Sequence, residues 1–184
     1  MELFFDTETS GFYNNKLSID DHNQAWVVQF GMILSDRDFI YHEVNIIICA
    51  DGRTIDPEAE AVHCISAEIS DNVGLPEATA LRLFDELMGK ATILICHNYD
   101  FDRKMISALY ARHNLEYFPA QDTYCTMKSS TDLCKIPGKY GNYKWPKLQE
   151  LHKFLFGEEF EDAHDALADV RATRRCYYEM VKEV

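Results

Sequence analysis

The sequence contains no apolar run of the roughly 18–20 residues that a membrane-spanning helix needs. Its N-terminal segment is acidic and lacks the basic and apolar pattern of a secretory signal peptide. The six cysteines include no C-x-x-C pair, so a zinc site is not expected. These absences favour a cytoplasmic protein with reduced thiols and no contact with a membrane.

Positive charge is also scarce, because 18 lysines and arginines stand against 31 aspartates and glutamates and the formal net charge is −13. This balance argues against a protein that holds nucleic acid through its overall charge. The charge is unevenly distributed, however, since residues 128–153 contain six lysines and two acids, a local excess of four. This stretch is either a solvated loop or a patch that faces phosphates, and the sequence leaves both interpretations open.

Repeats and low-complexity tracts are absent as well. Hydrophobic residues make up 47% of the chain and aromatic residues 12%, which excludes a disordered or fibrous class. A length of 184 residues fits one domain that buries its own core. We therefore expect residues 1–184 to form a single domain.

Three strands are predicted in the first quarter of the chain. Residues 3–5 are a short apolar strand that runs into acidic residues. Residues 23–34 and 38–49 are rich in Val, Ile, Phe and Tyr, and the short polar link at residues 35–37 separates them. This arrangement is typical of a hairpin in an antiparallel sheet.

Helices follow, and their ends carry recognisable signals. Asp56 is placed as an N-cap with Pro57 at the first helical position, which predicts a helix within residues 56–66. A second helix has apolar residues at helical spacing, with Pro76 at its start and Gly89 at its end.

The second half of the chain alternates strands and helices. Residues 93–96 and 118–126 are predicted to contain strands, residues 101–114 form a helix between them, and the last two helices lie within residues 146–157 and 162–184. Residues 129–146 show weak periodicity and are predicted to be a long loop. The order predicts an α/β fold, with a mixed five-stranded sheet that begins with three antiparallel strands and is flanked by helices.

Asp6 and Glu8 pose a physical problem at the end of the first strand. Side chains two apart in a strand point to the same face, so the two carboxylates lie side by side at the edge of the core. Repulsion and desolvation oppose this arrangement unless a cation is present. Mg²⁺ and Mn²⁺ are hard cations that carboxylate oxygens bind. Two acids rarely hold Mg²⁺ in a specific geometry, so we expect further ligands from elsewhere in the chain.

Two later segments offer such ligands. Asp102 lies in the first turn of the helix that follows the strand Ile93–Cys96, and Asp100 fits the cap of that helix. On the last helix, Asp165 is the expected cap and Asp169 lies one turn further on, so its carboxylate faces the helix entrance.

His164 directly precedes Asp165. A lone histidine is more often a surface or capping residue. Beside a carboxylate, however, an imidazole with a pKa near neutrality suits a general base.

Taken in this order, the motifs "DTETSG", "HNYDFD" and "HDALADV" resemble those of the DEDDh exonucleases, the family that includes the proofreading subunit of bacterial replicative DNA polymerase. "DPEAEAVHCIS" is similar to the intermediate segment of this family, and a histidine five residues before the last acid is typical of the "h" branch. The resemblance implies an RNase H-like fold and a 3′–5′ exonuclease. Such an enzyme releases nucleoside monophosphates from 3′ ends of DNA, single-stranded ends preferred, with two Mg²⁺ ions for which Mn²⁺ can substitute.

The resemblance also implies roles for individual residues. His164 would be the base that takes a proton from the attacking water, and Cys64 stands where the family usually has glycine, which leaves the neighbouring roles open. The four metal-binding acids would be Asp6, Glu8, Asp102 and Asp169. The substrate would be contacted by Thr9, Phe12, His63, Ile65 and Asn98 near the terminal nucleotide and by Lys139, Lys144 and Lys147 along the backbone.

Three alternatives remain open at this point. A 3′–5′ exoribonuclease of the same family would use the same metal core, so the sequence does not separate DNA from RNA. A catalytically silent nucleic-acid-binding module is disfavoured by the five intact site residues, and an RNase H-like endonuclease does not explain the motif "HDALADV". The expected partner is nucleic acid with a free 3′ end; a protein partner or a homodimer cannot be read from the sequence.

Overall fold

The computed structural model describes residues 1–182 and is built around one five-stranded sheet in the order β3-β2-β1-β4-β5. β1, β2 and β3 are antiparallel neighbours, whereas β4 runs parallel to β1, and β5 runs parallel to β4. The predicted mixed sheet with three antiparallel strands first is confirmed. The strands are β1 (Glu2–Thr9), β2 (Val27–Ser35), β3 (Ile40–Ile47), β4 (Ile93–Cys96) and β5 (Asp122–Cys125).

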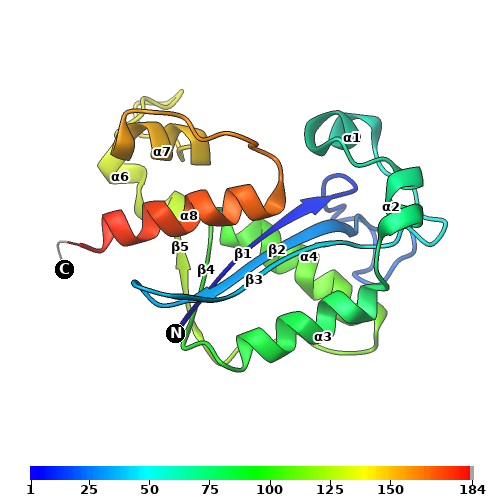
Figure 1. Cartoon of the computed structure of the whole chain (residues 1–184). Helices are drawn as coiled ribbons and strands as arrows, with labels where there is room; N and C mark the ends of the chain where they lie inside the picture. Colours follow the sequence, from blue (N-terminus) through cyan, green and yellow to red (C-terminus); the bar gives the residue numbers. More distant parts are fainter. Residues whose placement is uncertain (183–184) are drawn as a thin grey trace.

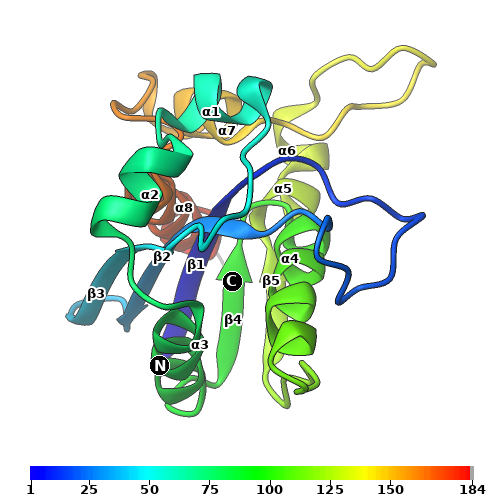
Figure 2. The ribbon, with the colours of Figure 1, turned by 90° about the vertical axis from the view of Figure 1, so that its right-hand side faces the viewer.

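Helices cover both faces of the sheet. α3 (Glu77–Met88) and α4 (Tyr99–Arg112) lie on one face, and α8 (Ala166–Met180) lies on the other (Figures 1 and 2). α7 (Leu148–Phe156) packs against α8. The shorter helices are α1 (Pro57–His63), α2 (Ala67–Val73), α5 (Thr126–Ser129) and α6 (Thr131–Cys134).

The alternation of side chains along β1 produces two cores, one on each face of the sheet. Leu3 and Phe5 point into the larger core under α3 and α4, where Phe5 packs edge-on against Phe84. Phe4 points the other way, into a smaller core under α8 that contains Val170. β1 is therefore buried on both faces over its first half, and its acidic second half is held at a defined place.

The start of α8 is held tightly against β2. The side-chain oxygen of Gln29 accepts a hydrogen bond from the Ala166 backbone at 3.0 Å, and its Nε2 donates to the carboxylate of Asp165 at 2.7 Å. Gly31 makes room for this approach, because a Cβ built there would lie 2.5 Å from the carbonyl oxygen of Ala166. Asp165 is the N-cap of α8, as predicted, and accepts a hydrogen bond from the backbone of Ala168.

The predicted cap of α4 was wrong. The helix begins at Tyr99, so Asp100 lies inside the first turn, where its carboxylate pairs with Lys128 at 2.6 Å. Asn98 occupies the cap position in the left-handed region, with φ 72, and makes no capping hydrogen bond through its side chain. Asparagine tolerates this region better than most residues do, which lets the chain turn sharply from β4 into α4.

The helix predicted within residues 56–66, with Asp56 as its N-cap, is confirmed as α1. α1 ends at His63 because Cys64 adopts the left-handed conformation, and a new helix, α2, starts after Ser66 caps it. The last helix, α8, begins at Ala166, directly after the predicted cap Asp165, and the preceding residues Asp162 and His164 both have positive φ. Residues 183 and 184 of the predicted helix lie outside the described residues.

Residues 129–146 are not a structureless loop. They contain α6 and, after it, a short hairpin in which Pro137 pairs with Tyr143. The helix has only four residues, too few to produce a visible helical period, and the hairpin is held by two backbone hydrogen bonds.

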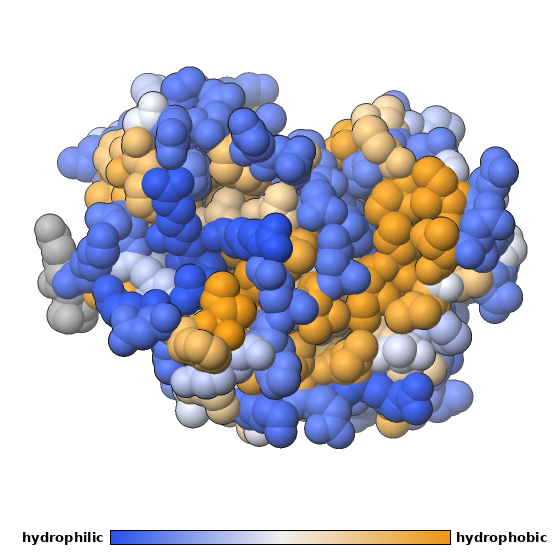
Figure 3. All heavy atoms as spheres, viewed as in Figure 1, coloured by the Kyte–Doolittle hydropathy of each residue, from blue (hydrophilic) through white to orange (hydrophobic). Residues whose placement is uncertain are grey.

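Within residues 1–182, none of the helices combines the length and the apolar character needed to cross a membrane. Exposed apolar side chains nevertheless gather on one surface around α2 (Figure 3). Ile69 and Val73 lie one turn apart on α2, and Leu75 follows shortly after the helix.

Candidate active site

Asp6 and Glu8 lie on the face of β1 that α8 covers. Asp6 is paired with Gly31 across the strands, and Glu8 is paired with Gln29. Gly31 and Gln29 contact the first residue of α8, so both acids lie beneath the N-terminus of that helix. The prediction that the two carboxylates share one face is confirmed.

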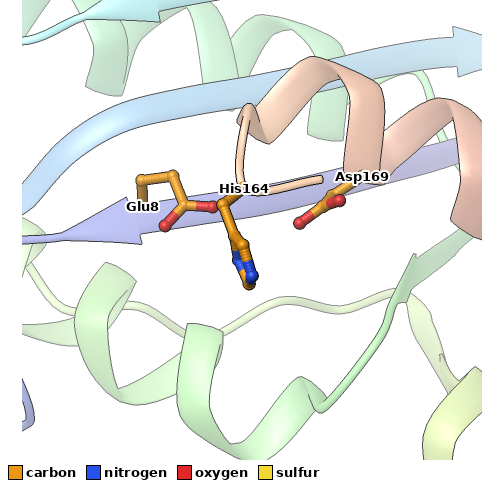
Figure 4. A group of neighbouring side chains, drawn as sticks. All are labelled: Glu8, His164 and Asp169. Carbon is orange, nitrogen blue, oxygen red and sulfur yellow. The ribbon is translucent and has the colours of Figure 1, made fainter. Parts of the chain in front are cut away.

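Glu8, His164 and Asp169 converge in space. One oxygen or nitrogen atom from each side chain lies within 4.8 Å of the other two. Figure 4 shows Glu8 extending from β1, His164 from the turn before α8 and Asp169 from the first turn of α8. His164 is exposed, while both acids are half-buried. More than 150 residues separate Glu8 from His164 in the chain, so the fold brings the motif residues together.

Asp102 approaches β1 from the opposite face of the sheet. It is buried in the first turn of α4, and its Oδ1 accepts two hydrogen bonds from Thr7. The Thr7 hydroxyl donates at 2.8 Å and the Thr7 backbone N–H donates at 3.2 Å. These bonds engage Oδ1 only and fix the orientation of the carboxylate.

Sequence reasoning missed Thr7, although a signal was present. Alternation along β1 places Thr7 on the same face as Leu3 and Phe5, which point into the larger core. A buried polar side chain on an otherwise apolar face needs a hydrogen-bond partner. The position of Thr7 between the two acids therefore indicated a polar partner on the other side of the sheet.

The pKa shifts link all four acids to one site. Burial raises the pKa of Asp6 well above its usual value, and the carboxylates of Asp102 and Asp169 raise it further. Burial and the same two neighbours raise the pKa of Glu8 to about 8. Burial raises the pKa of Asp102 to about 7 and that of Asp169 to about 7. Loss of solvation thus raises the pKa of each carboxyl group, and repulsion by the neighbouring carboxylates raises the pKa of Asp6 and Glu8 further.

The four acids fit a divalent cation. Within residues 1–182, none of them forms an ion pair with a lysine, an arginine or a histidine. The Oδ1 atom of Asp169 is buried and has no hydrogen-bond partner among the described residues. Buried, unpaired carboxylate oxygens that repel one another are the ligands that Mg²⁺ and Mn²⁺ prefer.

Two of the predicted substrate-binding residues, Thr9 and His63, lie close to this site. Thr9 ends β1, and its hydroxyl donates to the carbonyl of Gly11 at 2.9 Å. His63 is buried, and its Nδ1 accepts from the backbone of Ile65 at 3.1 Å. Burial lowers the pKa of His63, and an interaction with the backbone of Thr9 raises it in part. His63 therefore lies beside the end of β1.

The two predicted apolar contacts, Phe12 and Ile65, differ in solvent exposure. Phe12 is 88% exposed, whereas Ile65 is buried in the larger core. Cys64 between His63 and Ile65 has φ 60. A left-handed backbone favours glycine, which explains why the family pattern has glycine at this position.

The three predicted backbone-binding lysines also differ from one another. Lys139 and Lys147 are exposed, but the ammonium group of Lys144 contacts the carboxylate of Glu150 at 2.6 Å. A phosphate contact by Lys144 would require this ion pair to break.

Comparison with known proteins gives a consistent result. The family model RNase_T, described as exonuclease, matches residues 3–177. The PolC-type DNA polymerase III of Streptococcus pneumoniae serotype 2 is 34% identical over 109 residues, which cover 59% of this chain and 7% of that protein. A protein of Escherichia phage 186, named as an uncharacterized exonuclease, is 26% identical over 182 residues, which cover 93% of this chain and 83% of that protein.

Solved structures show the same fold. E. coli Exonuclease I in complex with an oligonucleotide matches with a TM-score of 0.76 at 20% identity, covering 99% of this chain and 40% of that chain. A zinc-bound form of its complex with single-stranded DNA matches with a TM-score of 0.73, at the same identity and coverage. The chain thus spans less than half of Exonuclease I and less than a tenth of the polymerase. Because the family model covers nearly the whole sequence, the chain belongs to the exonuclease family that this model describes.

Proposed function

We propose that residues 1–184 form a single exonuclease domain that hydrolyses DNA from its 3′ end and releases nucleoside monophosphates, with single-stranded ends preferred. The observation that carries this proposal is the convergence of Glu8, His164 and Asp169, with the buried carboxylates of Asp6 and Asp102 beside them. DNA is favoured as the substrate because the relatives include a DNA polymerase and an exonuclease that was solved with DNA.

Asp6, Glu8, Asp102 and Asp169 would hold two Mg²⁺ ions, with Mn²⁺ as a substitute. When bound, such ions lower the pKa of a water molecule and stabilise the charge on a leaving oxygen. The acids lie on β1 and on α4 and α8, two helices that both pack against β1, so their carboxylates keep a defined arrangement. Before cations bind, the same negative charge would repel the phosphates of a nucleic acid.

His164 would act as the general base. Its imidazole lies next to the carboxylates of Glu8 and Asp169 and is exposed, so a proton taken from water can pass on to solvent. General bases typically contribute about 10²–10⁴-fold to the rate.

The substrate would be held by residues around this centre. The exposed ring of Phe12 would stack on the terminal base, with the edge of Ile65 opposite it. Thr9, His63 and Asn98 would border the terminal nucleotide. Lys139 and Lys147, together with Lys144 once it leaves Glu150, would contact phosphates further along the strand.

A time course on labelled strands tests the proposal. DNA and RNA oligonucleotides of one sequence, labelled at the 5′ end, are incubated with Mg²⁺, with Mn²⁺ or with EDTA. We expect a ladder of products shortened one nucleotide at a time from the 3′ end of DNA, and no products in EDTA. Internal cuts on a strand with a blocked 3′ end would indicate an endonuclease, and faster shortening of RNA would indicate the exoribonuclease. Metal-dependent products from neither strand would overturn the proposal.

A further inference from the structure

One segment combines lysines and aromatic residues without any acid. We name residues 135–147 the aromatic arm; it contains four lysines, three aromatic residues and no aspartate or glutamate. In a chain of net charge −13 this composition is a local exception. The lysines are Lys135, Lys139, Lys144 and Lys147, and the aromatic residues are Tyr140, Tyr143 and Trp145.

The aromatic arm has a defined shape. The backbone of Gly138 donates to the carbonyl of Asn142 at 2.7 Å, and the backbone of Lys144 donates to the carbonyl of Ile136 at 2.9 Å. These bonds form a short hairpin that projects from the molecule (Figure 2). The loop that contains Phe12 projects from the same side in that view.

The root of the aromatic arm is anchored to the site. His97, which follows β4, lies with its Nε2 3.0 Å from the carbonyl oxygen of Pro146 and its Nδ1 2.9 Å from the hydroxyl of Thr126. The ion pair between Lys144 and Glu150 fixes the root to α7. Since β4 leads directly into the helix that carries Asp102, the aromatic arm has a fixed position relative to the metal-binding acids.

The aromatic rings of the arm point into solvent. The exposed fraction is 92% for Tyr140 and 59% for Trp145, and Tyr143 is also exposed. Several large rings close together on one projecting segment form a surface that contributes no packing to the core. Such a surface is typical of a binding element rather than of a structural one.

The positive charge of the aromatic arm indicates which kind of partner it binds. Among the described residues, no ion pair involves Lys135, Lys139 or Lys147. Free lysines between exposed aromatic rings match the phosphates and the bases of a single strand. In a duplex, the faces of the bases are stacked on each other and are not available to the rings.

We propose that the aromatic arm binds single-stranded nucleic acid upstream of the 3′ terminal nucleotide, with bases stacked on Tyr140 and Trp145 and phosphates contacted by the free lysines. This inference rests on the proposed exonuclease function and adds a second contact region to it. The contact favours substrates that are long enough to reach from the acids to the arm, so hydrolysis becomes more efficient as the strand lengthens.

Tryptophan fluorescence tests the stacking directly. The chain has two tryptophans, and Trp26 is buried while Trp145 is exposed. Titration in Mg²⁺ with a 20-nucleotide single strand whose 3′-terminal linkage cannot be hydrolysed should quench the emission of Trp145. The Trp145→Phe variant removes this signal and identifies its source. An unchanged emission in the unsubstituted protein during binding would overturn the stacking on Trp145.

Kinetics of the double variant Tyr140→Ala/Trp145→Ala test the role in catalysis. Tyr143 is left in place because it pairs with Pro137 in the hairpin. We expect kcat/KM on a 20-nucleotide single strand to fall at least about tenfold. Hydrolysis of the p-nitrophenyl ester of thymidine 5′-monophosphate, which is too short to reach the arm, should not change.

Two controls separate the possible failures. Phe118 is 83% exposed and lies before the start of β5, at the far end of that strand from His97, so Phe118→Ala should leave both substrates unaffected. A strand with abasic sites upstream of its 3′ end keeps its phosphates but offers no bases, and it should bind the unsubstituted protein as weakly as the normal strand binds the double variant.

If the ester is hydrolysed but the double variant acts on long DNA and RNA as well as the unsubstituted protein does, the arm proposal is wrong and the arm belongs to a different partner, such as a protein. If the unsubstituted protein cleaves neither the ester nor any strand, the exonuclease proposal itself fails.

Discussion

His164 is the residue on which the proposed mechanism depends most directly. It is exposed, has φ 72 and lies beside Glu8 and Asp169 without belonging to a helix. We expect His164→Ala to lower turnover about 10²–10⁴-fold while metal binding stays nearly unchanged. Steady-state kinetics and a Mn²⁺ titration measure the two effects.

The positive φ of His164 calls for a matched control. Alanine is strained in the left-handed region, whereas asparagine tolerates it, so His164→Asn removes the imidazole and keeps the backbone. Both variants should be equally slow. Full activity in His164→Asn would remove His164 from the role of base.

Thr7 is expected to position Asp102. Thr7→Val keeps the shape of the side chain but removes the hydroxyl that donates to the Asp102 carboxylate at 2.8 Å. We expect metal affinity, measured by calorimetric titration, to fall about 10–100-fold, a range typical of residues that orient a metal ligand. Thr7→Ser restores the hydroxyl and should restore affinity. An unchanged affinity in Thr7→Val would show that the backbone N–H alone orients the carboxylate.

Cys64 offers a prediction about stability. Its φ of 60 strains a residue with a Cβ by about 1–2 kcal/mol, whereas glycine adopts this conformation freely but costs more backbone entropy. Cys64→Gly should therefore raise the free energy of unfolding by up to about 1 kcal/mol, as measured in urea. Cys64→Ala keeps the Cβ and should give no gain; an equal gain in both variants would point to the thiol instead.

At the scale of secondary-structure elements, the start of α8 sets the geometry of the site. This helix carries Asp169, and His164 lies just before it. Both depend on the close contact of the helix with Gly31 and on the two hydrogen bonds from Gln29. Movement of the helix would therefore displace a carboxylate and the imidazole together.

Gly31→Ala tests this dependence. The added methyl group would lie 2.5 Å from the Ala166 carbonyl oxygen, a backbone atom that cannot move without the helix. We expect a loss of about 1–3 kcal/mol in the free energy of unfolding and a marked drop in activity. Gly89→Ala is a suitable control, because its Cβ would meet nothing closer than 3.3 Å. Normal stability and activity in Gly31→Ala would show that the entrance of α8 is adaptable.

At the scale of the whole molecule, the acidic cluster makes stability depend on pH. The pKa values of Asp102 and Asp169 are raised to about 7 and that of Glu8 to about 8, well above those of unfolded carboxyl groups. Between pH 6.5 and 8 the metal-free folded state therefore binds more protons than the unfolded state does. Its stability must fall as the pH rises through this range.

Thermal unfolding in EDTA measures this effect. The Tm of the metal-free protein should be lower at pH 8 than at pH 6.5, and Mn²⁺ should raise the Tm more at pH 8, because metal binding requires deprotonated carboxylates. Asp169→Asn removes one of the titrating groups and should flatten the dependence on pH. A Tm in EDTA that does not fall over this range would contradict the acidic cluster.

The apolar surface around α2 is also a property of the whole molecule. It lies over Ile69 and Val73 and is separate from the aromatic arm in sequence. The sequence identified neither a protein partner nor a homodimer, and this surface is compatible with either.

The parts of the fold that depend on nearby residues were predictable from the sequence. Apolar runs and runs rich in Val, Ile, Phe and Tyr indicated most of the strands, and Asp56 and Asp165 marked two helix starts through their caps. The acidic motifs identified the catalytic candidates because each motif is only a few residues long. The sequence did not predict that α1 ends before Cys64 or that Asn98, rather than Asp100, caps α4, because both Cys64 and Asn98 adopt the left-handed backbone conformation.

What the sequence determined by itself was the chemistry available: four acids and a histidine in a fixed order, on strands and helices set by local periodicity. Only the tertiary structure decided how they meet. The hydrogen bonds from Thr7 to Asp102 join residues 95 positions apart, and the contact of Gly31 with Ala166 joins residues still further apart. Such contacts depend on how segments pack after they form, which no local pattern encodes.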